Sequence, residues 1–265
     1  MKKSILLAGA LCLFLGFLSA CGTSSGNEAE KNNIGDSGKK VLTIGTEGTY
    51  KPFSFKNLKT GKLTGYDVEV AREVAKRIGM KPNFVLTPWK SMFGALNSKR
   101  FDMIANQVGI NLQRKKHYAF SIPYTYSGAK VIVNKDNTTI HGWDDLKGKV
   151  VGTTKGSNYA KYAKEAGAKL KYYKGIDQVL TDLKAKRIDA ALNDRLFILT
   201  QLDSKNNLKT VGEVSHKSKM AFMFRQKGSE DLIHKVNKAL KAMKKDGTLK
   251  KISEKWFGAN VSEPR

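Results

Sequence analysis

Stretches with strand character alternate with stretches of helical spacing along most of this 265-residue chain. Val41–Thr46 is predicted to be a buried strand, and the helix that follows it is predicted to be capped by Asp67. Asn83–Thr87 and Phe101–Ala105 are predicted strands on either side of a helix over Trp89–Lys99. Because a helix between two strands brings them side by side in parallel, the alternation predicts an α/β fold built from βαβ units.

The same order returns further along the chain. Leu96–Asn106 resembles Leu183–Asn193, since each runs from a helix end through a basic turn and an aspartate into an apolar strand. The strands end at Asn106-Gln107 and at Asn193-Asp194. Ligands bind at the carboxyl ends of strands in open α/β sheets, so two such edges facing one another would form a cleft. A chance likeness between two helix–turn–strand units is the alternative.

The N-terminal segment is typical of a secreted lipoprotein. Met1-Lys2-Lys3 is a short basic region, and residues 4–18 are apolar or small, in a run too short for a comfortable membrane span. Leu18-Ser-Ala-Cys21 then resembles a lipobox, in which Cys21 becomes the lipidated first residue. We expect a signal peptide over residues 1–20, a flexible tether over 21–40, and a protein at the extracellular face of the cell membrane. An uncleaved anchor with an accidental cysteine is the alternative.

Composition restricts the partners and the redox chemistry. The formal net charge of +25 is typical of chains that meet nucleic acid, an anionic membrane or an anionic polymer. Secretion argues against nucleic acid, and the spread of lysines along the chain favours a solvated surface; an anionic wall polymer or the host matrix is the more specific alternative. Cys12 would leave with the signal and Cys21 would carry the lipid, so we expect a folded domain without disulfides.

Residues near the predicted strand ends suit a small zwitterion such as a free amino acid. Burying its carboxylate and ammonium costs free energy unless both are paired, so a receptor needs a cation, an anion and an apolar wall. Arg114 can grip a carboxylate with two parallel hydrogen bonds, and Gly109 lets the backbone approach a ligand. Asp194 is the candidate anion, and Glu47 is a second one. A surface arginine, a helix cap and a salt bridge are the ordinary alternatives.

The turn Lys155-Gly-Ser-Asn-Tyr159 opens a predicted helix, whose free N–H groups favour an anion. Tyr50, Phe53 and Trp89 are candidates for an aromatic wall, with a place in the core as the alternative. The four histidines share no metal-binding spacing, and no nucleophile elbow or phosphate loop is present. We therefore expect no enzymatic activity, no metal and no cofactor.

At these residues the chain strongly resembles the polar amino-acid-binding lipoproteins of ABC importers, over residues 41–258. The segments that carry the resemblance are Gly45–Phe53, Leu63–Glu69, Asn106–Gly109 with Arg114, Phe120–Tyr124, Asp246–Leu249 and Lys255–Gly258. The resemblance implies a type II periplasmic-binding-protein fold, in which two α/β lobes are joined by a two-strand hinge. Lobe 1 would comprise residues 41–127 plus 221–265, and lobe 2 residues 128–220. It further implies a monomer that docks on an ABC permease.

Within that family the chain is most similar to the L-cystine-binding proteins, through Thr46–Tyr50, Trp89–Phe93 and Asn106–Gly109. This implies that Arg114 and the Gly109 N–H hold the α-carboxylate, helped by the Ser157–Tyr159 turn. Asp194 would take the α-ammonium, Trp89 and Tyr50 would pack on the side chain, and Glu47 would accept the second ammonium of cystine. The full set of predicted ligand-binding residues is Glu47, Tyr50, Phe53, Trp89, Asn106, Gln107, Gly109, Arg114, Ser157, Asn158, Tyr159 and Asp194.

Three alternatives stay open on the sequence. The first is another polar amino acid as the ligand, such as glutamine, arginine or lysine. Many relatives have Thr or Ser where Gly109 stands, so this chain lacks a hydroxyl donor there, which argues against a simple copy of the glutamine or arginine site. The basic surface favours an adhesin for collagen or mucin as a second function class. An enzyme on the same fold, such as a dehydratase or a wall-glycan lyase, is the third.

Overall fold

The computed structural model describes residues 40–201 and 207–264. The predicted signal peptide, the lipidation site Cys21 and all but the last residue of the predicted tether lie outside the described residues. Among the helices of the described part, none combines the length and the apolar composition that crossing a membrane requires.

A nine-stranded mixed sheet runs through the described residues in the order β10-β9-β11-β8-β12-β6-β1-β5, with β7 paired to β12. Its strands are β1 (Val41–Thr46), β5 (Lys81–Leu86), β6 (Met103–Gly109), β7 (Tyr118–Phe120), β8 (Thr125–Asn134), β9 (Val150–Thr154), β10 (Lys169–Tyr173), β11 (Ala190–Asp194) and β12 (Leu208–Arg225). A smaller sheet consists of β2 (Thr49–Tyr50), β3 (Ser54–Lys56) and β4 (Leu63–Thr64).

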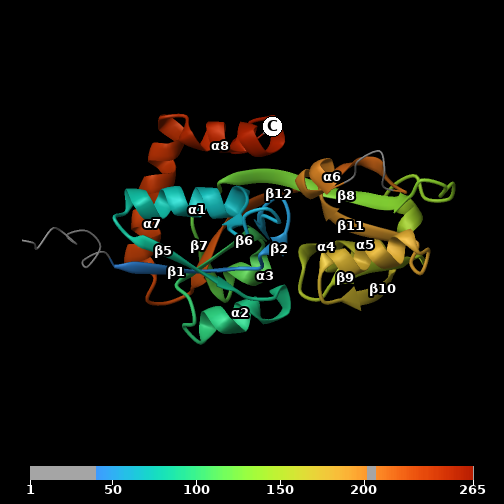
Figure 1. Ribbon diagram of the computed structural model, residues 1–265. Coiled ribbons are helices and arrows are strands. Elements are labelled where there is room, and N and C mark those ends of the chain that lie inside the picture. The colour runs from blue at the N-terminus through green and yellow to red at the C-terminus, as the bar shows by residue number, and fades with distance from the viewer. Residues whose placement is uncertain (1–39, 202–206, 265) are drawn as a thin grey trace, which may run out of the picture. The chain divides into compact units, whose positions relative to one another are not determined.

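Helices pack on the sheet in two groups (Figure 1). With β1, β5 and β6 lie α1 (Tyr66–Arg77), α2 (Trp89–Asn97), α3 (Leu112–Lys115), α7 (Glu230–Lys245) and α8 (Thr248–Phe257). With β9, β10 and β11 lie the short 3-10 turn Asp144–Leu146 and α4 (Asn158–Glu165), α5 (Ile176–Lys184) and α6 (Arg195–Gln201). In each group the helix-linked strands pair in parallel, β1 with β5 and β6, and β9 with β10 and β11. The predicted βαβ units are thereby confirmed.

Two long antiparallel strands, β8 and β12, pass from one group of elements to the other (Figure 1). They pair from Leu208 with Asn134 to Met220 with Thr125, and register shifts interrupt the ladder in between. The predicted lobe boundaries, at residues 127/128 and 220/221, fall inside these two strands. The exact division into lobes stays a prediction.

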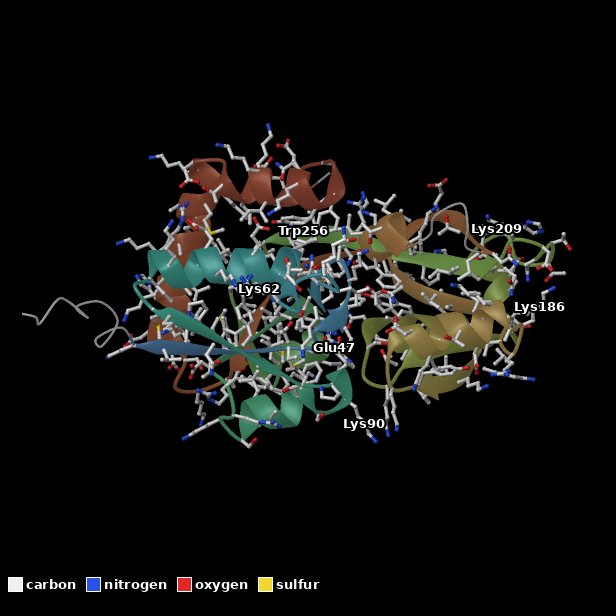
Figure 2. The ribbon with its side chains drawn as sticks, viewed as in Figure 1. Glu47, Lys62, Lys90, Lys186, Lys209 and Trp256 are labelled. Carbon is white, nitrogen blue, oxygen red and sulfur yellow. The ribbon has the colours of Figure 1, made fainter. Side chains whose placement is uncertain are left out.

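Polar side chains fasten neighbouring elements at the surface (Figure 2). The indole N–H of Trp256 on α8 donates to the carboxylate of Glu69 on α1, 2.8 Å away. At the opposite end of the sheet, Lys186 pairs with Asp136, and Lys209 Nζ donates to the Asn137 carbonyl at 2.8 Å. These contacts lie far from one another in Figure 2, so they stabilise the two groups of elements separately.

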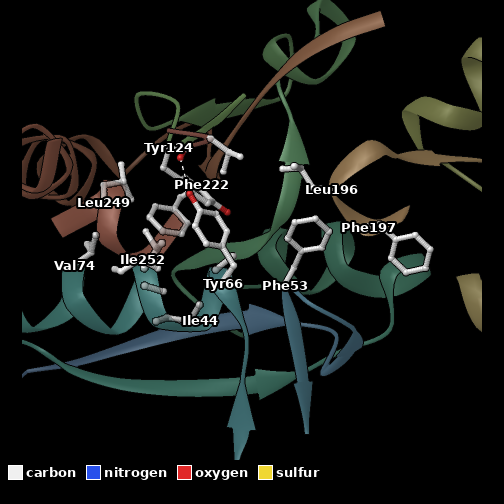
Figure 3. Packing of buried hydrophobic residues seen from close by; sticks show 14 of the residues in the cluster. Ile44, Phe53, Tyr66, Val74, Tyr124, Leu196, Phe197, Phe222, Leu249 and Ile252 are labelled. Carbon is white, nitrogen blue, oxygen red and sulfur yellow. Dashed lines mark hydrogen bonds between the residues drawn. The ribbon is translucent and has the colours of Figure 1, made fainter. Parts of the chain in front are cut away.

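The core beneath α1 and α8 is rich in aromatic rings (Figure 3). Tyr66 is fully buried and donates through its hydroxyl to the Tyr124 carbonyl at 2.9 Å. The ring of Tyr124 stacks on Phe222 with 4.5 Å between centroids. Phe53 is also fully buried in this core, beside Phe257, so it does not belong to an exposed aromatic wall. Its contact with the rest of the site is indirect, through the ring of Tyr50 at 5.0 Å.

The prediction that Asp67 caps α1 is wrong. Gly65 occupies the N-cap position and Asp67 lies in the first turn. The Asp67 carboxylate accepts from the backbone N–H of Gln107 at 2.7 Å and from the Gln107 side chain at 2.7 Å. Asp67 therefore does not cap its own helix; its carboxylate connects α1 to Gln107 near the end of β6.

Candidate ligand-binding cleft

A cavity lies where the ends of β1, β6 and β11 meet the starts of α2, α4 and α5. It encloses about 780 Å³ of empty space, counting the part that opens to solvent. All of the predicted site residues line it except Phe53 and Asp194. The remaining lining residues were not predicted: Thr49, Thr153, Thr154, Gly175, Ile176, Asp177, Val179, Leu192, Asn193 and Met220.

Arg114 supplies a buried positive charge at the cavity. It stands in α3, where Asn111 caps the helix by accepting from the Arg114 backbone N–H at 2.7 Å. Its guanidinium donates to the carbonyls of Gly109 at 2.8 Å and Gly156 at 3.1 Å, and the side chain is only 9% exposed. Burial lowers the pKa of Arg114 to about 10, so it remains charged at neutral pH.

No ion pair joins Arg114 to a carboxylate among the described residues. Its guanidinium carbon lies 5.4 Å from the ring centroids of both Trp89 and Phe93. Aromatic faces and two carbonyls compensate only part of the cost of burying a cation. The environment of Arg114 therefore favours an added anion.

Gly109 leaves room for a contact across the cavity. A Cβ built on Gly109 would lie 2.4 Å from Nδ2 of Asn158, much closer than real Cβ contacts. The Asn158 side chain occupies that space and accepts at Oδ1 from Asn111 Nδ2, 2.7 Å away. The missing side chain at Gly109 thus allows α4 to be hydrogen-bonded to the start of α3.

Asp194 is fully buried at the end of β11 and does not line the cavity. Its carboxylate accepts from Ser127 Oγ at 2.5 Å, from the Leu196 N–H at 2.8 Å and from the Tyr159 hydroxyl at 3.4 Å. Burial raises the pKa of Asp194 to about 6 against these hydrogen bonds. Tyr159 does line the cavity, so it connects the Asp194 charge to the cavity surface.

Glu47 supplies a negative charge from the other group of elements, because it follows β1 whereas Asp194 ends β11. Asn106 orients it, because Asn106 Nδ2 donates to the carboxylate at 2.7 Å and Asn106 Oδ1 accepts from the Glu47 N–H at 2.9 Å. Burial is the main cause that raises the pKa of Glu47, and the nearby charge of Asp177 adds to it. Asp177 lies in the first turn of α5, and no sequence motif marked it as a site residue.

Two polar atoms of lining residues have no partner among the described residues. They are the indole Nε1 of Trp89 and the side-chain oxygen of Gln107, and both are buried. Gln107 adopts a φ of 47°, a conformation that favours glycine. Its side-chain amide donates to Asp67 at 2.7 Å and to Thr125 at 3.2 Å, which holds this strained residue at the cavity. Burial raises the pKa of Asp67 to about 7.

The cavity therefore offers charges of both signs, separate from one another. Arg114 is a cation without an acid partner, and Glu47 and Asp177 are acids without a basic partner among the described ion pairs. The residues that the structure describes contain no cluster of three His, Cys, Asp or Glu that suits a metal ion. A ligand with several charges of both signs matches this arrangement best.

Residues 42–259 match the family model of the bacterial extracellular solute-binding proteins, family 3. The L-cystine-binding protein TcyA of Bacillus subtilis (strain 168) is 47% identical over 271 residues, which cover 99% of this chain and 100% of that protein. The L-cystine-binding protein TcyJ of Escherichia coli (strain K12) is 43% identical over 244 residues, 91% of this chain and 90% of that protein.

Two solved structures extend the comparison. An ancestral arginine-binding protein bound to glutamine has a TM-score of 0.78 and 38% identity, covering 83% of this chain and 99% of that one. The L-cystine solute receptor of Neisseria gonorrhoeae, in its unliganded open conformation, has a TM-score of 0.58 and 40% identity, covering 85% of this chain and 96% of that one.

Proposed function

The chain belongs to family 3 of the bacterial extracellular solute-binding proteins, and we propose that it captures L-cystine in the cavity for uptake by an ABC importer. The observation that carries this proposal is the buried Arg114 guanidinium without a carboxylate partner among the described residues. An amino-acid carboxylate is the anion that its planar array of donors fits best.

The α-carboxylate of the ligand binds Arg114 in this proposal. Two N–H groups of the guanidinium donate to the carbonyls of Gly109 and Gly156, which fixes the plane of the guanidinium. Its remaining N–H groups are available to the ligand. The unpartnered Trp89 Nε1 is a further donor at the same place. Each charge-assisted hydrogen bond contributes about 1.5–3 kcal/mol, before the costs of ordering and desolvation.

The α-ammonium lies toward Asp194. The buried Asp194 charge reaches the cavity through the Tyr159 hydroxyl, and a rotation of that hydroxyl opens the carboxylate to the ligand. Tyr50 packs on the ligand's side chain, held in place by stacking on Phe197 at 5.4 Å between centroids. The predicted roles of these residues are part of this proposal.

The distal half of the ligand distinguishes cystine from other amino acids. Cystine carries a second ammonium, and Glu47 with Asp177 offers two carboxylates to receive it. Glutamine has no charge there. Arginine and lysine have one distal cation and no second carboxylate, so they are the nearest competitors. Some relatives are named as L-cystine-binding proteins and one as an arginine-binding protein, so these names are compatible with cystine or arginine as the ligand.

Binding is coupled to closure about β8 and β12. Several hydrogen bonds cross the cavity: the Tyr50 hydroxyl donates to Asn193 at 2.8 Å, Asn111 donates to Asn158, and Arg114 donates to Gly156. The TM-score is higher with a ligand-bound relative than with an open cystine receptor of similar identity, which supports a closed arrangement here. We infer that the loaded, closed form is the one presented to the permease.

Attachment to the membrane completes the proposal. Members of this family act outside the cytoplasm, and a lipid on Cys21 would hold the chain near its permease. The predicted attraction to wall polymers and the predicted adhesin role depend on net charge alone, and no contact among the described residues favours them.

A binding panel tests the function. The purified chain is titrated by calorimetry with L-cystine, L-cysteine, L-glutamine, L-arginine and L-lysine. We expect L-cystine to bind with a Kd near or below the micromolar range, about −8 kcal/mol, and the single-ended amino acids to bind more weakly. Tighter binding of arginine or glutamine than of cystine would replace the proposed ligand.

A further inference from the structure

A second hollow adjoins the ligand cavity. It encloses about 730 Å³ of empty space, counting the part that opens to solvent, and shares the lining residues Trp89 and Thr154 with the cavity. We call it the lysine vestibule; its residues are Trp89, Lys90, Thr154, Lys155, Tyr172, Tyr173, Lys174 and Gln178. Of these residues, the sequence pointed only to Trp89, for an aromatic wall, and to Lys155, as the first residue of the predicted turn.

Three cations from separate segments line this one hollow. Lys90 comes from the first turn of α2, Lys155 from the turn after β9, and Lys174 from the turn between β10 and α5. Figure 2 shows Lys90 where α2 faces the elements of the other group. Like charges gathered around one hollow repel one another unless an anion lies between them.

Some exposed lysines of this protein have a carboxylate partner in the part that the structure describes, and these three do not. Lys171 pairs with Asp182, and Lys255 pairs with Glu69, each at less than 3 Å. Lys90, Lys155 and Lys174 form no ion pair with any carboxylate among the described residues. The vestibule is thus a cationic hollow to which the described part of the chain supplies no paired carboxylate.

The neighbouring walls of the vestibule are fixed. The Tyr173 hydroxyl donates to Asp182 at 2.7 Å, and the Lys174 backbone N–H donates to the side chain of Gln178 at 3.2 Å. These contacts hold the turn that carries Lys174 against the start of α5. The wall that carries Lys174 is therefore anchored by hydrogen bonds.

The position of the vestibule matches the far end of an elongated ligand. Trp89 links the two hollows, because its indole lies beside Arg114 in the cavity and also lines the vestibule. Glu47 and Asp177 occupy the cavity side, and the lysines occupy the vestibule side. An ammonium and a carboxylate on the same distal carbon would each find the opposite charge.

We propose that the lysine vestibule binds the second carboxylate of a ligand that carries an amino-acid group at each end. This inference rests on the proposed function and adds the recognition of the ligand's distal end. It makes the vestibule the part of the site that favours two-ended amino acids over arginine and lysine, which have a distal cation but no distal carboxylate.

A ligand pair and a variant pair test it together. L-Cystine is compared with the mixed disulfide of L-cysteine and cysteamine, which keeps the distal ammonium and lacks the distal carboxylate. The variant K90Q/K155Q/K174Q is compared with K235Q/K241Q/K251Q, which removes the same charge from exposed positions of α7 and α8. Calorimetric titration at physiological salt measures the affinity of each variant for each ligand, and the wild-type chain is titrated with the same two ligands.

We expect the wild-type chain and the α7–α8 variant to prefer L-cystine over the mixed disulfide by about tenfold, and the vestibule variant to lose that preference. The mixed disulfide should bind all three proteins alike. A vestibule variant that keeps the preference, or that loses affinity for both ligands equally, overturns the inference while cystine binding itself stands. Failure of the wild-type chain to bind either ligand overturns the proposed function as well.

Discussion

The guanidinium of Arg114 lies over the indole of Trp89, with 5.4 Å between its central carbon and the ring centroid. The indole N–H of Trp89 has no acceptor among the described residues, and the Arg114 guanidinium has no carboxylate partner there. A cation and a hydrogen-bond donor thus lie together at one cavity. In the proposed binding mode, one carboxylate of the ligand would satisfy both groups.

Replacing Arg114 with alanine should weaken L-cystine binding by at least about tenfold. The change removes the charge that pairs with the ligand's carboxylate and leaves that carboxylate buried without a partner. Arg100→Ala is the matched control, because Arg100 is exposed and does not line the cavity. Calorimetry that gives Arg114→Ala the affinity of Arg100→Ala would contradict the role of Arg114.

Replacing Asp194 with alanine should also weaken binding by at least about tenfold, although Asp194 does not line the cavity. The substitution removes the negative charge that attracts the ammonium and leaves the Ser127 and Tyr159 hydroxyls without their acceptor. Asp194→Asn keeps the shape, removes the charge and turns one of the two acceptor oxygens into an N–H donor. Equal affinity of Asp194→Asn and the wild-type chain would mean that the charge does not act on the ligand.

Substitution of Gly109 with serine should weaken binding through Asn158. Since a Cβ at Gly109 would lie 2.4 Å from Asn158 Nδ2, the serine must displace Asn158 and break its hydrogen bond with Asn111. Asn158→Ala alone also loses that bond, so adding it to Gly109→Ser should cost little more. A double-mutant cycle by calorimetry measures this coupling, and additive effects would show that the two positions are independent.

The pH dependence of stability should reveal Asp67. Burial raises its pKa to about 7 from 3.8. Below about pH 4 the residue is protonated in both the folded and the unfolded chain, and between about pH 4 and 7 the folded chain holds the proton more strongly. The contribution of Asp67 to the free energy of unfolding is therefore largest below pH 4 and declines as the pH rises to 7.

Asp67→Asn should flatten that decline, and Asp231→Asn, which changes an exposed carboxyl group in α7, should leave it unchanged. Urea unfolding of the ligand-free chain at several pH values between 4 and 7.5 provides the measurement. A slope in Asp67→Asn as steep as in the wild-type chain would assign the titration to other groups.

The sequence predicted the alternating elements well because their signals are local. Val41–Thr46 has the predicted bounds, and the helix predicted over Trp89–Lys99 ends at Asn97. The strand predicted over Phe101–Ala105 is displaced to Met103–Gly109. Its polar residues suggested a strand end, whereas distant partners satisfy them inside the strand: Asn106 bonds to Glu47, and Gln107 to Asp67.

Half of the residues that line the cavity were predicted from the sequence, but their surroundings were not. The sequence position of Phe53 suggested an aromatic wall of the site. Its full burial depends on the packing of Phe257 of α8 beside it, which the local sequence does not indicate. Asp177, Lys90 and Lys174 carry no motif, since they come from turns and helix starts whose meeting depends on the whole sheet order. Contacts between residues far apart in the chain are the part that periodicity does not encode.

A crystal structure of the chain grown with saturating L-cystine tests the central claim most directly. The account predicts one cystine in the cavity, with one carboxylate on the Arg114 guanidinium, one ammonium near Tyr159 and Asp194, and the distal ammonium facing Glu47 and Asp177. A vacant cavity under those conditions, or a bound cystine whose carboxylates both lie away from Arg114, would contradict it.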